Sequence, residues 1–340
     1  AVTRLPRFAR ELAEYAYTPL ARPRLVAAAR EVGADFIYER YAFGCAAGVQ
    51  AARRVGLPLV LEVNSPLVLE LSKTRGLAFP GVAAGMERHI FQSADRVCVV
   101  TGVLGEMLAE MGVERERLLV TPNGVHLEQY APHDPAARAA ARADLGLARL
   151  GAEQVVLGFV GYYRGWHRLD LVVAALARPE LARAVLVLVG EGPARAELAE
   201  AAARHGVERR VLFAGSRAHD AIPRLLAAFD LALVPAINPY ASPLKLFEYM
   251  AARRPIVATR IPALEGLLRH GENAWVVAPD SSEALAEGIE HVFSDPDLGA
   301  HMAANAWREV QRFSWQRRAS EILAAAGFGR GTRSDAPCSA

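Results

Sequence analysis

The 340-residue sequence predicts an α/β protein with two parallel-sheet domains that face each other across a cleft. Short apolar runs alternate with segments of helical length along most of the chain, which is typical of βαβ units. The alternation pauses once, in a stretch rich in Ala, Arg, Pro and Asp at residues 133–150, and then resumes. With 52% hydrophobic and 22% charged residues, a chain of this length can build two separate cores.

The first half of the chain opens with a helical region. Thr18-Pro19 divides it into two expected helices, 5–17 and 22–32, because proline normally ends a helix. Strands are expected at residues 36–38, 59–63, 96–100 and 118–120, and further helices at 44–54, 82–91 and 103–111. The segments 62–66 and 121–124 follow strands and are candidate cleft loops, with ordinary turns as the alternative.

The second half repeats the pattern after a domain boundary expected near residues 148–154. The expected strands are 155–160, 185–189, 211–214, 231–234, 256–258 and 274–277. The expected helices are 170–176, 194–205, 221–229, 243–252, a short one near 264–268, 282–293 and 297–310. The last residues, 328–340, have the Gly, Ser, Arg and Asp content of a disordered tail.

The helix expected at 243–252 is the most informative element of the second half. Ser242 is a suitable N-cap and Pro243 suits the first turn, while Leu244, Phe247 and Met250 repeat at helical spacing. The first amides of a helix lack intrahelical partners and lie at the positive end of its dipole. This helix start is therefore a candidate phosphate-binding site.

Two charged residues accompany that helix start. Lys245 lies in the first turn and Glu248 one turn later, and Lys245 is one of only two lysines in the chain. This pair suits a sugar nucleotide, with the ammonium and the helix amides on the diphosphate and the carboxylate on the ribose diol. A surface ion pair at i, i+3 is the alternative.

The sequence lacks the complete motifs of several other classes of enzyme and binding site. The sequence has no His-x-His, His-Glu-x-x-His or Cys-x-x-Cys, which argues against a dedicated metal site, and no P-loop or nucleophile elbow. Residues 189–195 resemble a dinucleotide fingerprint without its third glycine, so hydride transfer is disfavoured. The glycine-punctuated strand end at 158–167 offers Arg164 and His167 to a phosphate, with a packed loop as the alternative.

Charge and cysteine content bear on the binding partners and the cellular compartment of the protein. A net charge of +2 with dispersed basic residues gives no nucleic-acid footprint, although a local basic face leaves peripheral membrane contact open. The apolar runs are too short to span a bilayer. Three widely spaced cysteines without a secretory leader fit a reducing cytoplasm, with peripheral attachment at the inner membrane face as an open addition.

In their order, the motifs of this chain resemble those of glycosyltransferase family 4, the retaining nucleotide-sugar enzymes of GT-B fold, over most of residues 34–320. The matching landmarks are the segments 122–125, 158–161, 188–193, 211–215, 228–235, 242–251 and 270–274. The resemblance implies two Rossmann-like domains, sugar transfer from a nucleoside diphosphate with retention of configuration, and no required metal or other cofactor.

The resemblance implies a domain plan. Residues 1–148 would form the acceptor-side domain, without the leading strand and glycine-rich loop that the family places before residue 36. Residues 149–312 would form the nucleotide-sugar domain. Residues 313–327 would form a closing helix that returns to the first domain. The given segment is then either an incomplete chain or one that recruits the missing part.

Matched position by position, the chain departs from the family at several site residues. Glu248 matches the ribose-binding glutamate, but the glutamate expected at the donor sugar falls on Tyr240. The arginine and lysine that grip the diphosphate fall on Tyr162 and His167, and the acceptor-side histidine falls on Asn64. These departures put sugar selectivity in question.

The resemblance and the motifs together give a set of candidate site residues. The expected catalytic residues are Lys245, Arg164 and Asn64. The expected donor-binding residues are Glu248, Leu244, Ser242, Pro243, Tyr240, Gly161, His167, Glu191, Gly215 and Arg217.

The sequence therefore predicts a retaining glycosyltransferase acting on a nucleoside diphosphate sugar. A glycan, a lipid-linked sugar or a small molecule would be the acceptor, and polysaccharide biosynthesis a fitting setting. A non-catalytic sugar-nucleotide-binding protein is the first alternative, motivated by the substitutions above. A sugar-nucleotide epimerase of the same architecture is the second.

Overall fold

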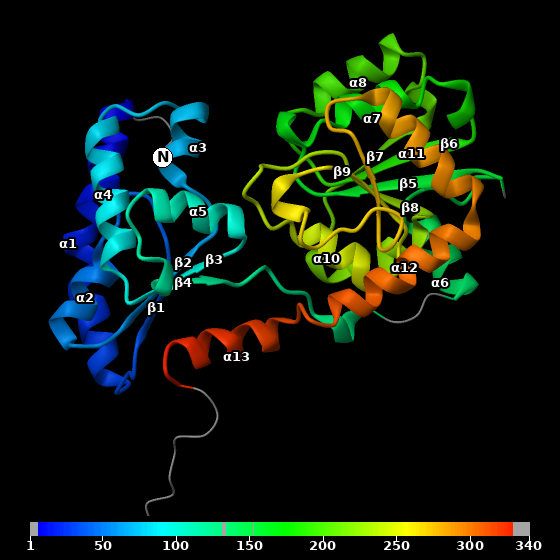
Figure 1. Cartoon of the computed structure of the whole chain (residues 1–340). Coiled ribbons are helices and arrows are strands. Elements are labelled where there is room, and N and C mark those ends of the chain that lie inside the picture. Colours follow the sequence, from blue (N-terminus) through cyan, green and yellow to red (C-terminus); the bar gives the residue numbers. More distant parts are fainter. Residues whose placement is uncertain (1–5, 131–133, 152, 329–340) are drawn as a thin grey trace, which may run out of the picture. The chain divides into compact units, whose positions relative to one another are not determined.

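The computed structural model describes residues 6–130, 134–151 and 153–328, and the chain separates into two compact units. Among the described residues, unit 1 contains 6–122, 240–242 and 316–328, and unit 2 contains 123–239 and 243–315. Each unit is built around its own parallel sheet (Figure 1), which confirms the predicted α/β class. Of the predicted tail, residues 329–340 lie outside the described residues.

The sheet of unit 1 has four parallel strands in the order β1-β2-β3-β4. Their bounds are β1 Ile37–Arg40, β2 Leu59–Val63, β3 Arg96–Val99 and β4 Leu118–Val120. All four lie within two residues of the predicted strands. The central strands are apolar on both faces because helices cover both sides, as parallel sheets require.

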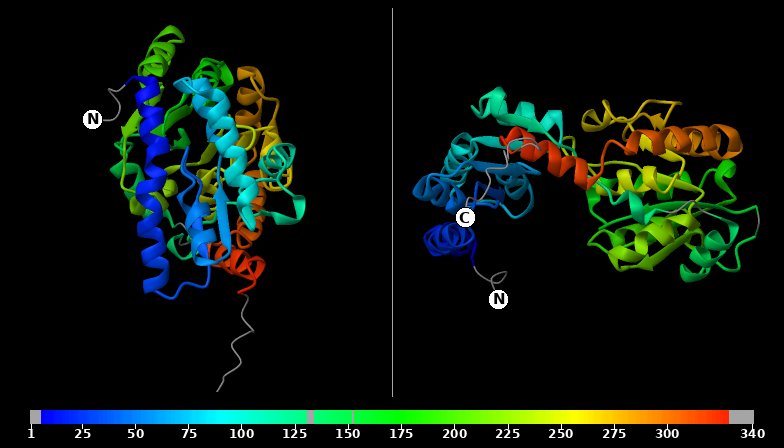
Figure 2. Two further views of the ribbon diagram at one scale, coloured as in Figure 1. Left: turned by 90° about the vertical axis from the view of Figure 1, so that its left-hand side faces the viewer. Right: turned by 90° about the horizontal axis from the view of Figure 1, so that it is seen from below.

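The opening region forms one helix, α1 (Arg7–Glu31), and the predicted break at Thr18-Pro19 is wrong. Figure 2 shows this helix along its length on the left and nearly end-on at the right. Pro19 and Pro23 lie inside it, where each removes a backbone hydrogen bond. Tertiary contacts offset that loss: α1 packs along α2 (Ala47–Val55), and the buried Thr18 hydroxyl accepts a 3.0 Å hydrogen bond from the Ala46 amide.

Unit 1 also contains a helix that sequence patterns missed, α3 (Leu67–Thr74). No residue near it in the sequence caps its N-terminus. Instead the buried Glu87 carboxylate of α4 (Pro80–Ser93) accepts hydrogen bonds from the Val68 amide at 3.1 Å and the Tyr41 hydroxyl at 3.0 Å. The remaining helix on this sheet is α5 (Gly102–Glu110), capped by Thr101.

The last described helix, α13 (Trp315–Ala325), packs on unit 1 from residue 316 onward. Ile322 joins the buried side chains of Val60 and Cys98, and Phe328 stacks on Phe36 at 5.0 Å. The side chain of Arg318 is nearly buried, and its Nη2 lies 3.3 Å from Glu62 Oε1. These contacts agree with the expected closing helix, although Phe328, assigned to the disordered tail, is packed.

Unit 2 holds six parallel strands in the order β10-β9-β8-β5-β6-β7. Their bounds are β5 Val155–Val160, β6 Ala184–Val189, β7 Val211–Gly215, β8 Leu231–Val234, β9 Ile256–Thr259 and β10 Trp275–Val277. The chain builds outward from β5 in one direction through β6 and β7, and then restarts on its other side with β8. This reversal between β5 and β8 is a topological switch point, where open α/β sheets bind their ligands.

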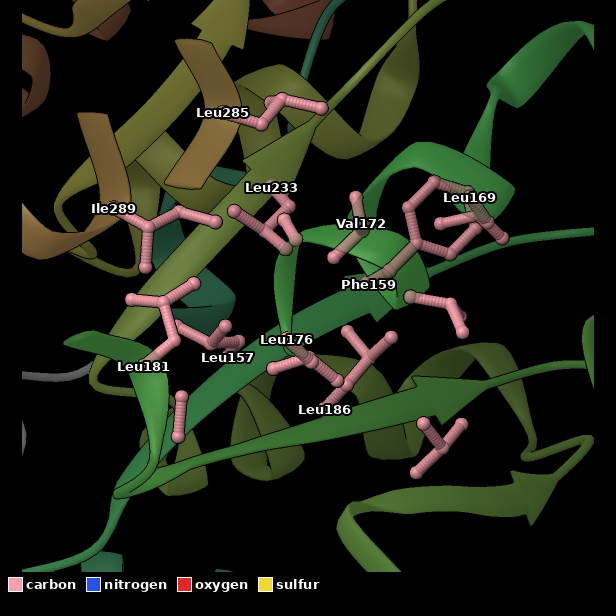
Figure 3. Packing of buried hydrophobic residues seen from close by; sticks show 14 of the residues in the cluster. Leu157, Phe159, Leu169, Val172, Leu176, Leu181, Leu186, Leu233, Leu285 and Ile289 are labelled. Carbon is pink, nitrogen blue, oxygen red and sulfur yellow. The ribbon is translucent and has the colours of Figure 1, made fainter. Parts of the chain in front are cut away.

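Helices cover both faces of this second sheet. Figure 3 shows buried side chains of the core that strands and helices of unit 2 form together, including Phe159, Val172 and Leu233. The helices are α6 Pro135–Asp144, α7 Leu169–Ala175, α8 Arg195–Arg204, α9 Ile222–Leu225, α10 Leu244–Ala251, α11 Ser282–Ser294 and α12 Pro296–Val310. The helix predicted at 221–229 is divided into α9 and flanking 3₁₀ turns. The short helix predicted near 264–268 is a 3₁₀ turn at 262–264.

The boundary between the units lies at residues 122 and 123 rather than near residue 148. Residues 135–144, predicted as part of a connection, form α6, which packs on α9 and the 3₁₀ turn that follows it. Asp230, just before β8, fixes this helix through ion pairs with Arg138 and Arg142. The stretch looked like a linker because its apolar residues are nearly all alanine.

None of the helices that the structure describes combines the length and the apolar character that crossing a membrane requires. Within the same residues, no cluster of three or more His, Cys, Asp and Glu side chains is arranged to hold a metal ion.

Candidate functional site

The loops at the carboxyl ends of β5 and β8 meet at the switch point of the second sheet. The loop after β5 contains Gly161, Arg164 and His167, and the segment after β8 leads into α10. The His167 ring joins the two loops, because its Nδ1 lies 3.0 Å from the Ala236 carbonyl oxygen and donates to it. The sequence thus places several predicted site residues at the edge where this fold class binds ligands.

Glycines allow the backbones of neighbouring loops to approach closely at this edge. Gly190, after β6, has φ +138°, and a Cβ there would lie 2.0 Å from the carbonyl oxygen of Gly161. A Cβ on Gly192 would lie 2.3 Å from the backbone of Tyr163. Hydrogen bonds fix this contact, from the Tyr163 amide to the Glu191 carbonyl at 2.8 Å and from the Gly161 amide to Val189 at 2.9 Å.

The loop after β7 extends the same edge. The Gly215 carbonyl accepts a 2.9 Å hydrogen bond from the Gly190 amide, and Gly215 has φ +72°. Glu191 pairs with Arg195 at 2.7 Å, and the Arg195 guanidinium lies over the Phe213 ring. The predicted base-side residues Glu191 and Gly215 are therefore neighbours, and Arg217 is exposed on the same loop.

The helix at the centre of the prediction begins one residue later than expected. Pro243, and not the predicted Ser242, occupies the N-cap position of α10. Leu244 was expected on the apolar face but is 44% exposed, whereas Phe247 and Met250 are buried. Proline has no side-chain acceptor for the first amides of α10, and these amides lie at the positive end of the helix dipole.

Lys245 turns its side chain inward toward the loop after β5. Its Nζ lies 3.8 Å from the centre of the Phe159 ring, a cation–π contact, and 3.0 Å from the position of a Cβ on Gly161. Burial lowers the pKa of this amine to about 7, and the Glu248 carboxylate only partly opposes that shift. Among the residues that the structure describes, no carboxylate forms an ion pair with this amine, so a bound anion would favour its protonated form.

Glu248, one turn further along α10, is 8% exposed. Burial raises the pKa of its carboxyl group, and the positive charges of His219 and Lys245 oppose that rise. His219 is one ionisable neighbour, and its Nδ1 lies 4.0 Å from Glu248 Oε1. No hydrogen bond to this carboxylate occurs among the described residues, so its oxygens are available to hydroxyl donors.

His167 and Arg164 differ in how closely they join this cluster. The His167 ring packs edge-on against Phe159 at 5.2 Å, and burial together with the Lys245 charge lowers its pKa to about 4. His167 is therefore neutral near pH 7. The Arg164 guanidinium instead lies over the exposed rings of Tyr162 and Trp166, and it lines a hollow of about 440 Å³ between α7 and α8.

Three predicted site residues belong to unit 1. Tyr240 is buried in the core of that unit, where its hydroxyl donates to Glu70 Oε1 at 2.9 Å and its carbonyl accepts from the Thr101 hydroxyl at 2.8 Å. Ser242 lies in the same short segment. Asn64 follows β2 and is half-buried, with its Oδ1 buried and without a hydrogen-bond partner among the described residues.

Two residues of this region were missed by the sequence patterns. The fully buried Tyr249 hydroxyl accepts a 2.8 Å hydrogen bond from the Val160 amide, which anchors α10 to the end of β5. A tyrosine within an apolar helix was the available signal, because a buried hydroxyl needs a partner. His219 lies nearly 30 residues from Glu248 in sequence, and no local pattern indicated their proximity.

Comparison with protein families matches both halves of the chain. The model described as Glycosyltransferase Family 4 matches residues 1–129, and the model described as Glycosyl transferases group 1 matches residues 154–295.

Curated relatives give the same assignment. D-inositol 3-phosphate glycosyltransferase of Rhodococcus jostii is 30% identical over 301 residues, which cover 85% of this chain and 65% of that protein. The protein of the same name from Actinosynnema mirum is 29% identical, with 87% and 73% covered. The chain thus spans about two thirds of the length of these relatives.

Solved structures resemble the fold. The Anabaena protein Alr3699/HepE, crystallised with UDP and glucose, matches with a TM-score of 0.76 and 25% identity over 91% of this chain and 81% of that one. Sucrose-phosphate synthase of Thermosynechococcus elongatus matches with a TM-score of 0.72 and 22% identity, over 91% and 77%. The two parallel sheets, the family models and these neighbours agree with the predicted GT-B fold, and the chain belongs to glycosyltransferase family 4.

Proposed function

We propose that this protein transfers a sugar, with retention of configuration, from a nucleoside diphosphate to a hydroxyl-bearing acceptor. The observation that carries the proposal is the cluster at the switch point of the second sheet. There the start of α10, the Lys245 amine and the Glu248 carboxylate lie at the edge where glycines let the loops after β5 and β6 approach closely.

Lys245 takes over the diphosphate-binding role in this proposal. The positions matched to the usual arginine and lysine hold Tyr162 and His167, and His167 is neutral near pH 7. Lys245 reaches the same loop from α10, with its Nζ beside Gly161. A cation placed at a departing diphosphate stabilises the charge that develops in the transition state, which is worth roughly 3–4 kcal/mol for one well-placed donor.

The remaining roles follow from the same cluster. The Glu248 carboxylate accepts hydrogen bonds from the ribose hydroxyls. Glu191 after β6, together with Gly215 and Arg217 at the end of β7, faces the base. Arg164 adds positive charge beside the phosphates, and Asn64 serves on the acceptor side. No metal or cofactor takes part in this scheme.

The donor is proposed to be a UDP-sugar. The Anabaena neighbour was crystallised with UDP and also with UDP-glucose, the latter structure being 26% identical over 91% of this chain. A phosphorylated polyol is a candidate acceptor, because the relatives are named for D-inositol 3-phosphate. A glycan or a lipid-linked sugar remains the other acceptor class, and the lipid-linked one would require peripheral membrane contact.

The test is a calorimetric titration with UDP-glucose and UDP. We expect Glu248→Gln to weaken binding roughly 10-fold to 100-fold, because charged hydrogen bonds contribute about 1.5–3 kcal/mol. Glu287→Gln is the matched control, since Glu287 is exposed on α11 and distant in the sequence from the site. Equal affinity of Glu248→Gln and the parent would contradict the assigned role.

A transfer assay separates catalysis from binding. We expect Lys245→Met to lower the rate of UDP-glucose turnover by at least about 100-fold, whereas Lys73→Met, which removes the other lysine on an exposed part of α3, keeps the parental rate. Binding of UDP-glucose by the parent without transfer or hydrolysis would favour the non-catalytic alternative.

A further inference from the structure

A second cavity of about 610 Å³ lies at the amino ends of the strands in unit 2, the edge opposite the switch-point loops. The first residues of β5 and β8, Val155 and Leu231, form part of its wall, and Pro255 after α10 forms another part. Its volume is in the range of pockets that hold small organic ligands. None of the predicted donor-binding residues lines it.

Positive charge predominates around this cavity. Four arginines line it, Arg138, Arg183, Arg253 and Arg254, against two carboxylates, Asp230 and Glu153.

Asp230 already forms ion pairs and a hydrogen bond within the protein. It pairs with Arg138 and, at 2.7 Å, with Arg142, and it accepts the Val156 amide at 2.8 Å. No carboxylate of the described residues forms an ion pair with Arg183, Arg253 or Arg254. Among the residues that line the cavity, positive charges therefore outnumber negative ones.

The backbone of Arg253, one of the arginines that line the cavity, has an unfavourable conformation. It follows the C-cap of α10 with φ +51°, the left-handed region that normally favours glycine. The amides of Arg253 and Arg254 bond to the carbonyls of Met250 and Tyr249, the pattern of a Schellman motif. Glycine would cost less backbone free energy here, whereas the arginine side chain gains a cation–π contact, with its Cζ 4.2 Å from the centre of the Trp307 ring.

Arg254 is held in a buried position near one acidic and one basic side chain, Asp230 and Arg138. Its guanidinium donates to the carbonyls of Ala252 and Phe229, at 2.9 Å each, which fixes it beside the cavity. Burial lowers its pKa to about 10, with the charge of Arg138 adding to that effect and Asp230 opposing it. A bound anion would offset the cost of holding these cations together.

We infer that this cavity binds a small phosphate ester. Guanidinium groups match the oxygens of a phosphate with paired hydrogen bonds, and three arginines that form no ion pair with a described carboxylate line one hollow. The first turn of α12, although Asp295 caps one of its amides, adds the positive end of a helix dipole. Val292, Phe293 and Ala303 supply an apolar wall for the organic part of the ligand.

The test uses glucose 6-phosphate as the probe, with inorganic phosphate as the bare anion and glucose as the uncharged control. Arg253→Gly is the decisive variant: it removes the charge, and relief of the left-handed backbone offsets the lost contact with the Trp307 ring, so the protein should still fold. Arg209→Gln is the matched control, since it removes an exposed arginine outside the cavity. Calorimetry on the full chain measures each affinity.

The parent is expected to bind glucose 6-phosphate and, more weakly, inorganic phosphate, but not glucose. Arg253→Gly and Arg183→Gln should each weaken glucose 6-phosphate binding by roughly 10-fold or more, with Arg209→Gln unchanged. Glu248→Gln should also leave it unchanged, which separates this cavity from the proposed donor site. No binding by the parent, or equal binding by Arg253→Gly and the parent, would overturn the inference.

Discussion

At the scale of single residues, Lys245 is held where its charge is unfavourable without a ligand. Its amine contacts the Phe159 ring rather than a carboxylate, and burial lowers its pKa to about 7 from an ordinary 10.5. A diphosphate beside it would favour the protonated form, so ligand binding and proton uptake are coupled at this side chain.

The binding of UDP-glucose should therefore depend on pH. As pH rises through the pKa of Lys245, the amine loses the charge that attracts the diphosphate, so affinity should fall between about pH 6 and about pH 9. Calorimetry at both pH values checks this on the parent and on Lys245→Met. A fall of the same size in both proteins would show that another group causes it.

The stability of the ligand-free protein should rise with pH, whereas the affinity for UDP-glucose should fall. Between the folded pKa of about 7 and the unfolded value of 10.5, the folded protein holds fewer protons at Lys245 than the unfolded chain. The free energy of unfolding from this group therefore rises with pH over that window. We expect Lys245→Met to be more stabilising near pH 6 than near pH 9 in urea unfolding, whereas Lys73→Met should show no such difference.

At the scale of elements, the βαβ pattern was readable from the sequence and several helix ends were not. Strands such as β5 and β8 are continuous apolar runs, and their predicted bounds are confirmed. The single helix α1 and the helix α3 were not predictable, because contacts from distant residues stabilise them, at Thr18 with Ala46 and at Val68 with Glu87.

The candidate site shows the same limit. The sequence placed Gly161, Lys245 and Glu248 on adjacent elements of one edge, because parallel strands bring their carboxyl ends together. It missed His219 beside Glu248, whose distance depends on the packing of a 3₁₀ turn. The hydroxyl of Tyr240 bonds to Glu70 within unit 1, which the sequence did not indicate, and its assignment to the donor stays a prediction.

The close approach of the loops after β5 and β6 should depend on Gly190. Gly190→Ala would place a Cβ 2.0 Å from the Gly161 carbonyl at φ +138°, and we expect it to destabilise the protein by about 2 kcal/mol or more and to weaken UDP-glucose binding. Gly266→Ala is the matched control, because its Cβ would meet nothing within 4 Å. Urea unfolding and calorimetry would contradict this account if the two variants behaved alike.

At the scale of the whole molecule, the chain forms two units with separate cores, and the proposed donor site lies in only one of them. A chain of this kind need not unfold in one step, and a ligand stabilises the part that binds it. The last described helix belongs to unit 1 although it follows unit 2 in the sequence, so the cores are not simply consecutive segments.

UDP-glucose should therefore protect the two units unequally. In native-state hydrogen exchange followed by mass spectrometry, we expect the ligand to slow exchange in β5, β6 and α10 and to leave β2 and β3 of unit 1 much less affected. Protection confined to unit 1 would show that the nucleotide binds elsewhere.

The most direct test of the proposed donor site is the labelling of Lys245 with an amine-reactive reagent, read by mass spectrometry with and without UDP, GDP or ADP. The chain has only two lysines, so Lys73 serves as the internal control in every sample. The account predicts that at least one of these nucleotides slows labelling at Lys245 and leaves Lys73 unchanged. Unchanged labelling of Lys245 at saturating concentrations of all three would contradict it.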